Sequence, residues 1–282
     1  MITQPSDAAA ASSSTPRQLR VGIAGFGDIG RGVAEKLLEG IPGFTLSAIG
    51  ARNRKKVEER IGSPAPVIIV DIDQLEPHSD IVVECVPAAL FCSVAEPVLR
   101  AGKKLVALSC GALLNNSHLL DLARDHGGQI IVPTGALLGL DAVTAAMEGR
   151  IEYVRMITRK PLASLAGAPF LEKNNIRIED IKTPLKIFSG SARDAAIGFP
   201  ANLNVGVALS LAGIGADKTT LEIWADPTID RNTHRIEVES DSARLSMEIG
   251  NLPGENQKTG RITPLSVVAL LRKMTAPLRI GT

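Results

Sequence analysis

A glycine-rich turn between a predicted strand and a predicted helix constrains the fold of this chain more than any other feature. The turn has the pattern G-x-G-x-x-G and consists of Gly25, Phe26, Gly27, Asp28, Ile29 and Gly30. It follows an apolar run at 20–24 and opens a helical segment at 31–40. In this context the glycines allow a tight turn, a close approach of backbone to a pyrophosphate, and close helix–strand packing. The helix N-terminus adds free N–H groups for phosphate. The motif therefore predicts a dinucleotide-binding site, with a purely structural turn as the alternative.

The segments after this turn alternate between short apolar strands and helices. Strands are predicted at 45–52, 66–71, 80–87, 103–110 and 129–135, with helices at 88–102 and 117–127 among them. Buried strands separated by helices are typical of a parallel sheet covered on both faces. The sequence thus predicts an α/β fold with an N-terminal Rossmann domain, a doubly wound parallel sheet.

The pattern changes near residue 149. The segments 151–161, 219–227, 233–240 and 243–251 alternate polar and apolar residues, as half-buried strands do. Asp241 and Ser242 make the last two segments a predicted hairpin. A second, α+β domain on a mixed or antiparallel sheet is expected, followed by a helix at 263–274.

These patterns divide the chain into four expected parts. They are a disordered tail at 1–17, the Rossmann domain at 18–140, a substrate and dimerisation domain at 141–260, and a C-terminal helix at 261–282 that packs back on the Rossmann domain or the interface. The uncharged stretch Ala195–Ala216 is long enough to span a bilayer, but its proline, asparagines and glycines favour a helix buried between the domains.

Composition excludes several functions. The net charge is +1 and aromatic residues make up 3% of the chain, which argues against nucleic-acid or membrane binding. Cys85, Cys92 and Cys110 are too few and too irregularly spaced for a disulfide framework, and no cluster suggests a metal. A cytoplasmic location is expected, because no signal peptide is recognisable.

The end of the second predicted strand bears on cofactor choice. NAD-binding domains commonly place an acidic residue there for the ribose 2′-hydroxyl, whereas this chain has Arg52, Asn53 and Arg54, with no acid until Glu58. Arginine can bind a 2′-phosphate. Contacts from Arg52 and Asn53 to NADP are therefore favoured, with NAD, use of both cofactors, or a merely solvated strand end left open.

Among the histidines, His234 alone is predicted to face a core. In the strand at 233–240 it shares a face with Ile236 and Val238, directly after a long loop. Histidine can exchange a proton near neutral pH while hydride moves. A catalytic acid/base and a satisfied core histidine are both consistent with this pattern. His78, His118 and His126 are expected on the surface, and Cys110 is expected to pack rather than act as a nucleophile.

Several segments together resemble the L-aspartate dehydrogenase family. They include TGA-x-x-GLDA at 134–142, P-x-N-x-NV at 200–205 and RN-x-H-x-I at 231–236, and the similarity runs from 19 to 273. The resemblance implies oxidation of L-aspartate to iminosuccinate with NAD or NADP, or the reverse reductive amination of oxaloacetate with ammonia. It also implies a homodimer and, for some members, a role in NAD biosynthesis.

The resemblance also implies roles for individual residues. It places the catalytic histidine on His234 and further cofactor contacts on Ala136 and Asn204, although Asn204 is also suited to capping a helix. Asn232 belongs to the same RN-x-H segment and is a candidate substrate contact. Lys160, which shares a strand face with Val154 and Met156, is a candidate partner for a substrate carboxylate, with a surface lysine as the alternative.

Two other functions stay open at this point. One is another amino-acid-pathway reductase of similar architecture, resembling dihydrodipicolinate reductase or homoserine dehydrogenase. The other is a redox sensor that binds NADP(H) without catalysis, against which the inward His234 argues.

Overall fold

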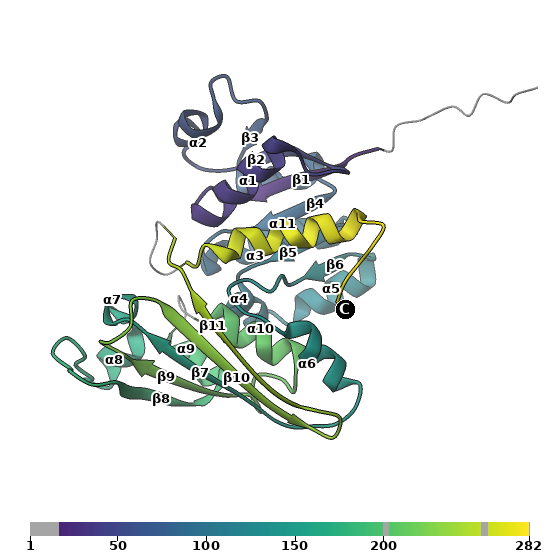
Figure 1. The fold of residues 1–282 in the computed structure, drawn as a ribbon. Helices are drawn as coiled ribbons and strands as arrows, with labels where there is room; N and C mark the ends of the chain where they lie inside the picture. Colours follow the sequence, from purple (N-terminus) through teal and green to yellow (C-terminus); the bar gives the residue numbers. More distant parts are fainter. Residues whose placement is uncertain (1–16, 200–202, 255–258, 282) are drawn as a thin grey trace, which may run out of the picture.

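A parallel six-stranded sheet forms the N-terminal half of the chain in the computed structural model, which describes residues 17–199, 203–254 and 259–281 (Figure 1). Its order is β3-β2-β1-β4-β5-β6. The strands are β1 (Leu19–Ala24), β2 (Phe44–Gly50), β3 (Ile68–Val70), β4 (Ile81–Glu84), β5 (Lys104–Ala107) and β6 (Gln129–Ile131). This order is that of the doubly wound dinucleotide-binding fold, so the predicted Rossmann fold is confirmed. The tail expected at 1–17 lies, except for Arg17, outside the described residues.

Helices cover both faces of this sheet because its strands are apolar on both sides. In β1, Val21 and Ile23 pack against one layer of helices while Ala24 faces the other layer. The first layer is α1 (Asp28–Gly40), α2 (Arg54–Ile61) and α11 (Ile262–Thr275), and the second is α3 (Phe91–Arg100) and α5 (His118–His126). The short helices η1 (Ile72–Gln74), η2 (Glu76–His78), η3 (Ala88–Leu90) and α4 (Cys110–Asn115) lie in the connections.

The helix α11 completes a core that begins more than 200 residues earlier in the chain. Val267 and Leu271 of α11 are fully buried in the same cluster as Val33 and Leu37 of α1. Figure 1 shows α11 running along the face of the parallel sheet. The N-terminal sheet is therefore closed by residues from the far end of the sequence.

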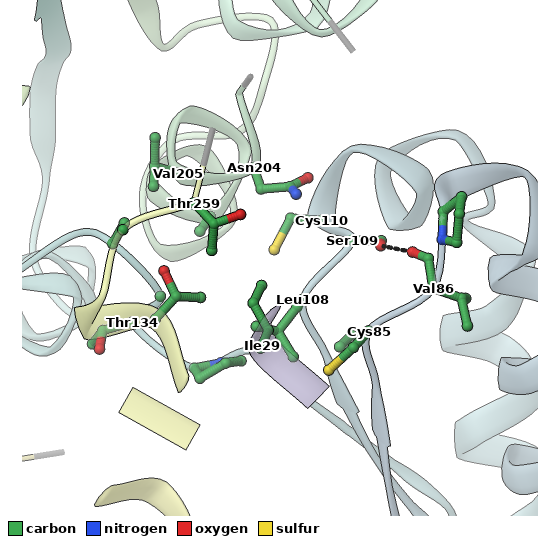
Figure 2. A pocket seen from close by; sticks show the side chains of 18 residues that line it. Ile29, Cys85, Val86, Leu108, Ser109, Cys110, Thr134, Asn204, Val205 and Thr259 are labelled. Atoms are coloured by element: carbon green, nitrogen blue, oxygen red, sulfur yellow. Dashed lines mark hydrogen bonds between the residues drawn. The ribbon is translucent and has the colours of Figure 1, made fainter. Parts of the chain in front are cut away.

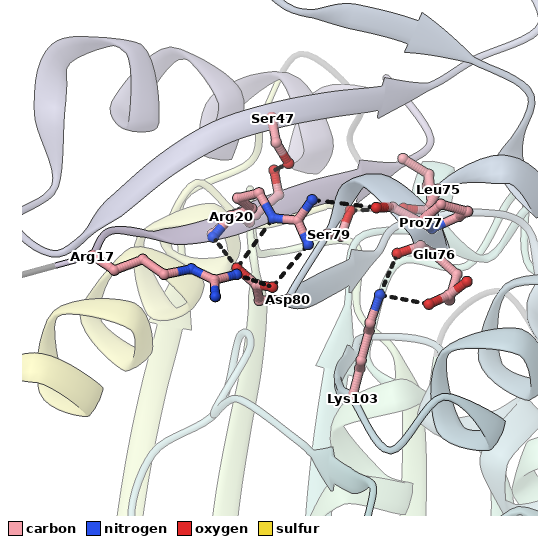
Figure 3. A network of polar contacts seen from close by, with 10 residues as sticks. Arg17, Arg20, Ser47, Leu75, Glu76, Pro77, Ser79, Asp80 and Lys103 are labelled. Carbon is pink, nitrogen blue, oxygen red and sulfur yellow. Dashed lines mark hydrogen bonds and ion pairs between the residues drawn. The ribbon is translucent and has the colours of Figure 1, made fainter.

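A polar network ties together the amino-terminal edge of the sheet (Figure 3). Asp80 accepts hydrogen bonds from the Arg20 backbone N–H at 2.9 Å and from its guanidinium at 2.9 Å, and this pairing lowers the pKa of Asp80. Lys103, at the start of β5, donates to the Glu76 carbonyl at 2.7 Å. These contacts lie at the amino ends of the strands. The site described below lies at the opposite edge of the sheet, at the carboxyl ends.

The second half of the chain contains a five-stranded mixed sheet with the order β11-β10-β7-β9-β8. Its strands are β7 (Ile151–Lys160), β8 (Leu185–Ser191), β9 (Thr220–Ala225), β10 (Asn232–Ser240) and β11 (Arg244–Asn251). Only the β7–β9 pair is parallel. The predicted hairpin of β10 and β11 is confirmed, and β8 is a strand that the alternation of residues did not predict.

The stretch Ala195–Ala216, expected to be one buried helix, contains parts of two helices. These are α9 (Ala192–Gly198) and α10 (Asn204–Ala212), while residues 200–202 lie outside the described part. Phe199 precedes a proline, a position that disfavours helical backbone, and it leaves the helix with a ψ of 55°. No helix in the described ranges has the length and hydropathy to cross a membrane. The single-helix prediction is therefore wrong, and the reason is local.

The helix α10 lies between the two sheets. A Cβ atom on Gly206 would come within 2.5 Å of the Leu221 side chain, so α10 packs closely on the mixed sheet. The same helix contacts α4 and α6 (Leu140–Met147) (Figure 1). The remaining helices are α7 (Leu162–Leu165) and α8 (Pro169–Lys173).

Candidate active site

The glycine-rich turn has the geometry that a pyrophosphate requires. Gly25 has a φ of +93°, and a Cβ there would lie 2.6 Å from the Cys85 carbonyl oxygen. A Cβ on Gly30 would collide with the Gly25 carbonyl, whereas one on Gly27 would meet no atom within 4 Å. Gly27 also caps α1 without any side-chain hydrogen bond. The turn is thus closed by Gly25 and Gly30 and open at Gly27, which fits a dinucleotide phosphate at the helix N-terminus.

A cavity of about 500 Å³ lies between the carboxyl ends of the parallel strands and the helix α10 (Figure 2). Ile29 of the glycine turn, Ala136 and Asn204 all line it, so the structure brings together three residues predicted from distant segments. Val86 and Ser109, which follow β4 and β5, also line it. The carboxyl edge of a doubly wound sheet is where such folds bind ligands.

Asn204 and Ala136 are each held by one hydrogen bond across the cavity wall. Asn204 Oδ1 accepts from the Gly111 backbone N–H at 3.2 Å, so it satisfies the start of α4 and not of its own helix. Asn251 Nδ2 donates to the Ala136 carbonyl at 2.8 Å and ties that segment to the end of β11. These bonds fix the two wall segments that the resemblance assigns to the cofactor.

Arg52 and Asn53 lie elsewhere, after β2, and neither is among the residues that line this cavity. Asn53 Oδ1 accepts from the Lys56 backbone N–H at 3.0 Å, so Asn53 is the N-cap of α2. Arg52 is exposed. Because β2 is the neighbour of β1 in the sheet, the two residues flank the glycine turn on the side away from the second domain.

A row of polar residues lies on the inner face of the mixed sheet and consists of Thr158, Lys160, His234, Asn232 and Asn251. His234 is only 3% exposed, and its Nδ1 lies 3.1 Å from Thr158 Oγ1 on the neighbouring strand. Lys160, two residues further along β7, is also 3% exposed and has no ion-pair partner in the described ranges. The inward orientation predicted for His234 and Lys160 is confirmed. Neither side chain is among the residues that line the 500 Å³ cavity.

The row ends at a second, smaller cavity of about 190 Å³. Asn232 and Asn251, which pair directly across β10 and β11, both line it. Their Oδ1 atoms are buried without a hydrogen-bond partner among the residues that the structure describes. Thr259 and Gly260 line both this cavity and the larger one, so the Asn232 end of the polar row lies where the two cavities meet.

Burial changes the pKa values of the two titratable residues in the row, His234 and Lys160. It lowers the pKa of His234 to about 3, with a further contribution from the charge of Lys160. It also lowers the pKa of Lys160 to about 8. At neutral pH the imidazole is therefore neutral, and in the protein without substrate it is a weak base.

The buried His234 predicts a pH dependence of stability. We expect the free energy of unfolding to fall as the pH drops from 6.5 towards 3, because the unfolded chain binds a proton at this histidine and the native chain does not. Urea unfolding of the wild type and of His234→Gln across this range measures the effect. The variant should show the shallower dependence, and parallel curves would contradict the lowered pKa.

Glu84, Ser109 and Asn251 are site residues that sequence reasoning missed. Glu84 ends β4 with no exposed surface and holds the loops after β4 and β5 together. The available signal was a single acid inside the apolar run 81–86. Asn251 could have been found by counting back from the turn at Asp241 and Ser242, which pairs it with Asn232.

The glycine turn, the cavity and the mixed sheet carrying a buried histidine define a two-domain nicotinamide-dependent dehydrogenase. The chain is 56% identical over 266 residues to the L-aspartate dehydrogenase of Bradyrhizobium diazoefficiens, covering 94% of this chain and 95% of the relative. It is also 56% identical over 271 residues to L-aspartate dehydrogenase 3 of Bordetella bronchiseptica, covering 95% and 100%. The chain therefore belongs to the L-aspartate dehydrogenase family.

Family models and solved structures agree with this assignment. Residues 141–274 match the C-terminal domain of aspartate dehydrogenase, and residues 25–133 match the NAD-binding domain of homoserine dehydrogenase. The fold is that of aspartate dehydrogenase from Thermotoga maritima, with a TM-score of 0.71, 24% identity, and coverage of 94% of this chain and all of the other. A hyperthermophilic archaeal homoserine dehydrogenase in complex with NADPH is less similar, with a TM-score of 0.56 and 14% identity.

Proposed function

We propose that this protein catalyses the NAD(P)-dependent oxidation of L-aspartate to iminosuccinate, or the reverse reductive amination. One observation carries the proposal: the histidine of the RN-x-H segment is buried on the strand whose Asn232 lines a cavity that shares Thr259 and Gly260 with the cofactor cavity, in a chain 56% identical to named L-aspartate dehydrogenases. The identity over both domains favours this function over the homoserine dehydrogenase-like, dihydrodipicolinate reductase-like and redox-sensor alternatives. It also supports residues 18–140 and 141–260 as the cofactor and substrate domains.

The residues that line the two cavities divide the binding tasks. The turn 25–30 would hold the pyrophosphate, and Ala136 and Asn204 would hold the nicotinamide end, whose ring accepts or gives the hydride. The aspartate would lie between this wall and the polar row. Asn232 and Lys160 would then bind its carboxylates, since a dicarboxylate needs cationic or amide partners.

His234 would serve as the acid/base of the reaction. In the oxidative direction it would take a proton from the substrate amine as hydride leaves the α-carbon for the cofactor. Alternatively it would act in the later step and take a proton from the water that hydrolyses the imine. Thr158 holds the ring through Nδ1, so Nε2 is the atom available for this transfer. Burial is the main cause of the lowered pKa of His234, and the charge of Lys160 adds to it. A substrate carboxylate bound to Lys160 would offset this second contribution and make the histidine a stronger base.

A turnover screen tests the function as a whole. Purified protein is offered L-aspartate, L-homoserine and a cyclic imine, each with NAD(H) and NADP(H). We expect turnover with aspartate and, in reverse, with oxaloacetate and ammonia. Turnover of homoserine or the imine alone, or cofactor binding without any turnover, would replace the proposal by one of the alternatives.

Arg52 and Asn53 would select the cofactor, and we propose that they favour NADP. Changing Arg52 to Asp should weaken NADP(H) binding roughly tenfold or more relative to NAD(H), the usual effect of losing a charged hydrogen bond. Dissociation constants for both reduced cofactors, measured by fluorescence, give the ratio. Arg60→Asp, at the far end of α2, is the matched control and should leave this ratio unchanged. Equal losses for both cofactors in Arg52→Asp would show that Arg52 does not select.

A further inference from the structure

Glu84 is a fully buried acid that the proposed reaction does not use. Its side chain ends β4 and accepts four hydrogen bonds, from the N–H groups of Val86 at 3.0 Å, Leu108 at 3.2 Å and Ser109 at 2.9 Å, and from Ser109 Oγ at 2.8 Å. A backbone N–H can only donate, so both carboxylate oxygens act as acceptors. Hydrogen bonds of this kind stabilise the ionised form, although burial raises the pKa of Glu84.

No cation balances this buried charge. Among residues 17–199, 203–254 and 259–281, no lysine, arginine or histidine forms an ion pair with Glu84, and its only donors are neutral. Buried carboxylates are ordinarily paired with a cation, because desolvation of an isolated charge is costly. A cation that pairs with Glu84 would therefore have to come from outside the described residues.

The surroundings of Glu84 indicate where that partner binds. Val86 and Ser109, two of its donors, line the 500 Å³ cavity and also a neighbouring cavity of about 510 Å³. Glu84 thus lies one layer of backbone behind the wall of the space proposed for the nicotinamide. The oxidised nicotinamide ring carries a positive charge, and the reduced ring carries none.

We propose that Glu84 is the counter-charge of the oxidised cofactor. Its carboxylate strengthens the binding of NAD(P)⁺ and leaves the binding of NAD(P)H unchanged. The inference rests on the proposed cofactor site. A fixed negative charge at this position attracts the cationic ring electrostatically and has no such effect on the neutral one. By stabilising the oxidised form it makes the bound reduced cofactor a better hydride donor, which favours the reductive amination direction.

The variant Glu84→Gln tests this with little change of shape. Its amide oxygen can stay towards the N–H groups of Leu108 and Ser109, and Ser109 Oγ can reorient to accept from the new NH₂ group. The Val86 N–H loses its acceptor, so some loss of stability is expected, and the cofactor ratio, not the melting temperature, is the readout. We expect the ratio of the dissociation constants of oxidised to reduced cofactor to rise on the order of tenfold. For a two-electron couple, tenfold corresponds to about 30 mV in the potential of the bound cofactor.

Binding titrations of both cofactor forms, without substrate, provide the readout. Ser109→Ala is the control, because it removes a hydroxyl bond of Glu84 but keeps the charge, and it should change both dissociation constants by the same factor. A Glu84→Gln protein that melts earlier but keeps the wild-type ratio would reduce Glu84 to a structural clamp and overturn the inference. Wild-type protein that binds neither form would instead contradict the proposed function.

Discussion

Replacing His234 by alanine should lower kcat roughly 10²- to 10⁴-fold, the usual effect of removing a positioned proton-transfer group. The dissociation constants of NAD(H) and NADP(H) should barely change, because the glycine turn and the cavity wall belong to other segments. Steady-state kinetics with aspartate and cofactor titration on the same preparation measure both quantities. The prediction rests on the inward position of His234 and its bond to Thr158.

Two comparisons separate catalysis from packing at this position. His234→Asn keeps some hydrogen bonding but cannot titrate near neutrality, so it should not restore the rate. A core histidine without a catalytic role would give a variant that melts earlier, yet keeps a near-normal kcat in the folded fraction. Melting temperature and kcat measured together therefore decide between the two roles, and a destabilised but fully active His234→Ala would end the catalytic assignment.

Replacing Lys160 by methionine should lower the activity of the enzyme and raise its stability. Loss of a charged partner for a substrate carboxylate should lower kcat/KM for aspartate by roughly 10- to 150-fold. The same change should stabilise the fold, because a pKa of about 8 for this buried lysine instead of 10.5 costs about 3 kcal/mol near neutral pH. Enzyme assays and urea unfolding at pH 7 measure the two effects.

Lys186→Met is the matched control for this variant. Lys186 belongs to the same sheet, but its side chain is 44% exposed and lies 3.7 Å from Glu222 on the outer face. Its replacement should leave both kcat/KM and stability close to wild type, since exposed ion pairs contribute little. A Lys160→Met enzyme with an unchanged KM and kcat would show that this lysine is buried for structural reasons alone.

Much of the fold follows from the sequence, because the strands of the parallel sheet are apolar on both faces and most strands of the mixed sheet alternate polar and apolar residues. The strand β8 escaped this reasoning for an identifiable reason. Ile187 and Phe188 are consecutive and both buried, because the pairing with β9 shifts register between Lys186 and Phe188. A bulge of this kind breaks the two-residue period on which strand prediction depends. Likewise, an unbroken uncharged stretch hid the division between α9 and α10.

Site residues could be predicted where the alternation within a single strand decides which way the side chain points. They could not be predicted where the side chain depends on contacts between two strands. The alternation in β10 alone placed His234 inward, and that in β7 placed Lys160. Glu84 was missed because its hydrogen-bond donors come from the ends of two neighbouring strands, whose proximity exists only after the parallel sheet has formed. The role of Asn53 as a cap and of Asn204 at the start of α4 also depended on contacts that local pattern does not encode.

The position of α11 has a consequence for how the protein is made. Translation produces α1 first, but the apolar side of α1 that carries Val33 and Leu37 is covered by Val267 and Leu271, which emerge from the ribosome some 230 residues later. The nascent first domain must wait for this cover with part of its interior open to water, while the complete mixed sheet is synthesised in between. The core of the first domain is therefore complete only after the mixed sheet has been synthesised.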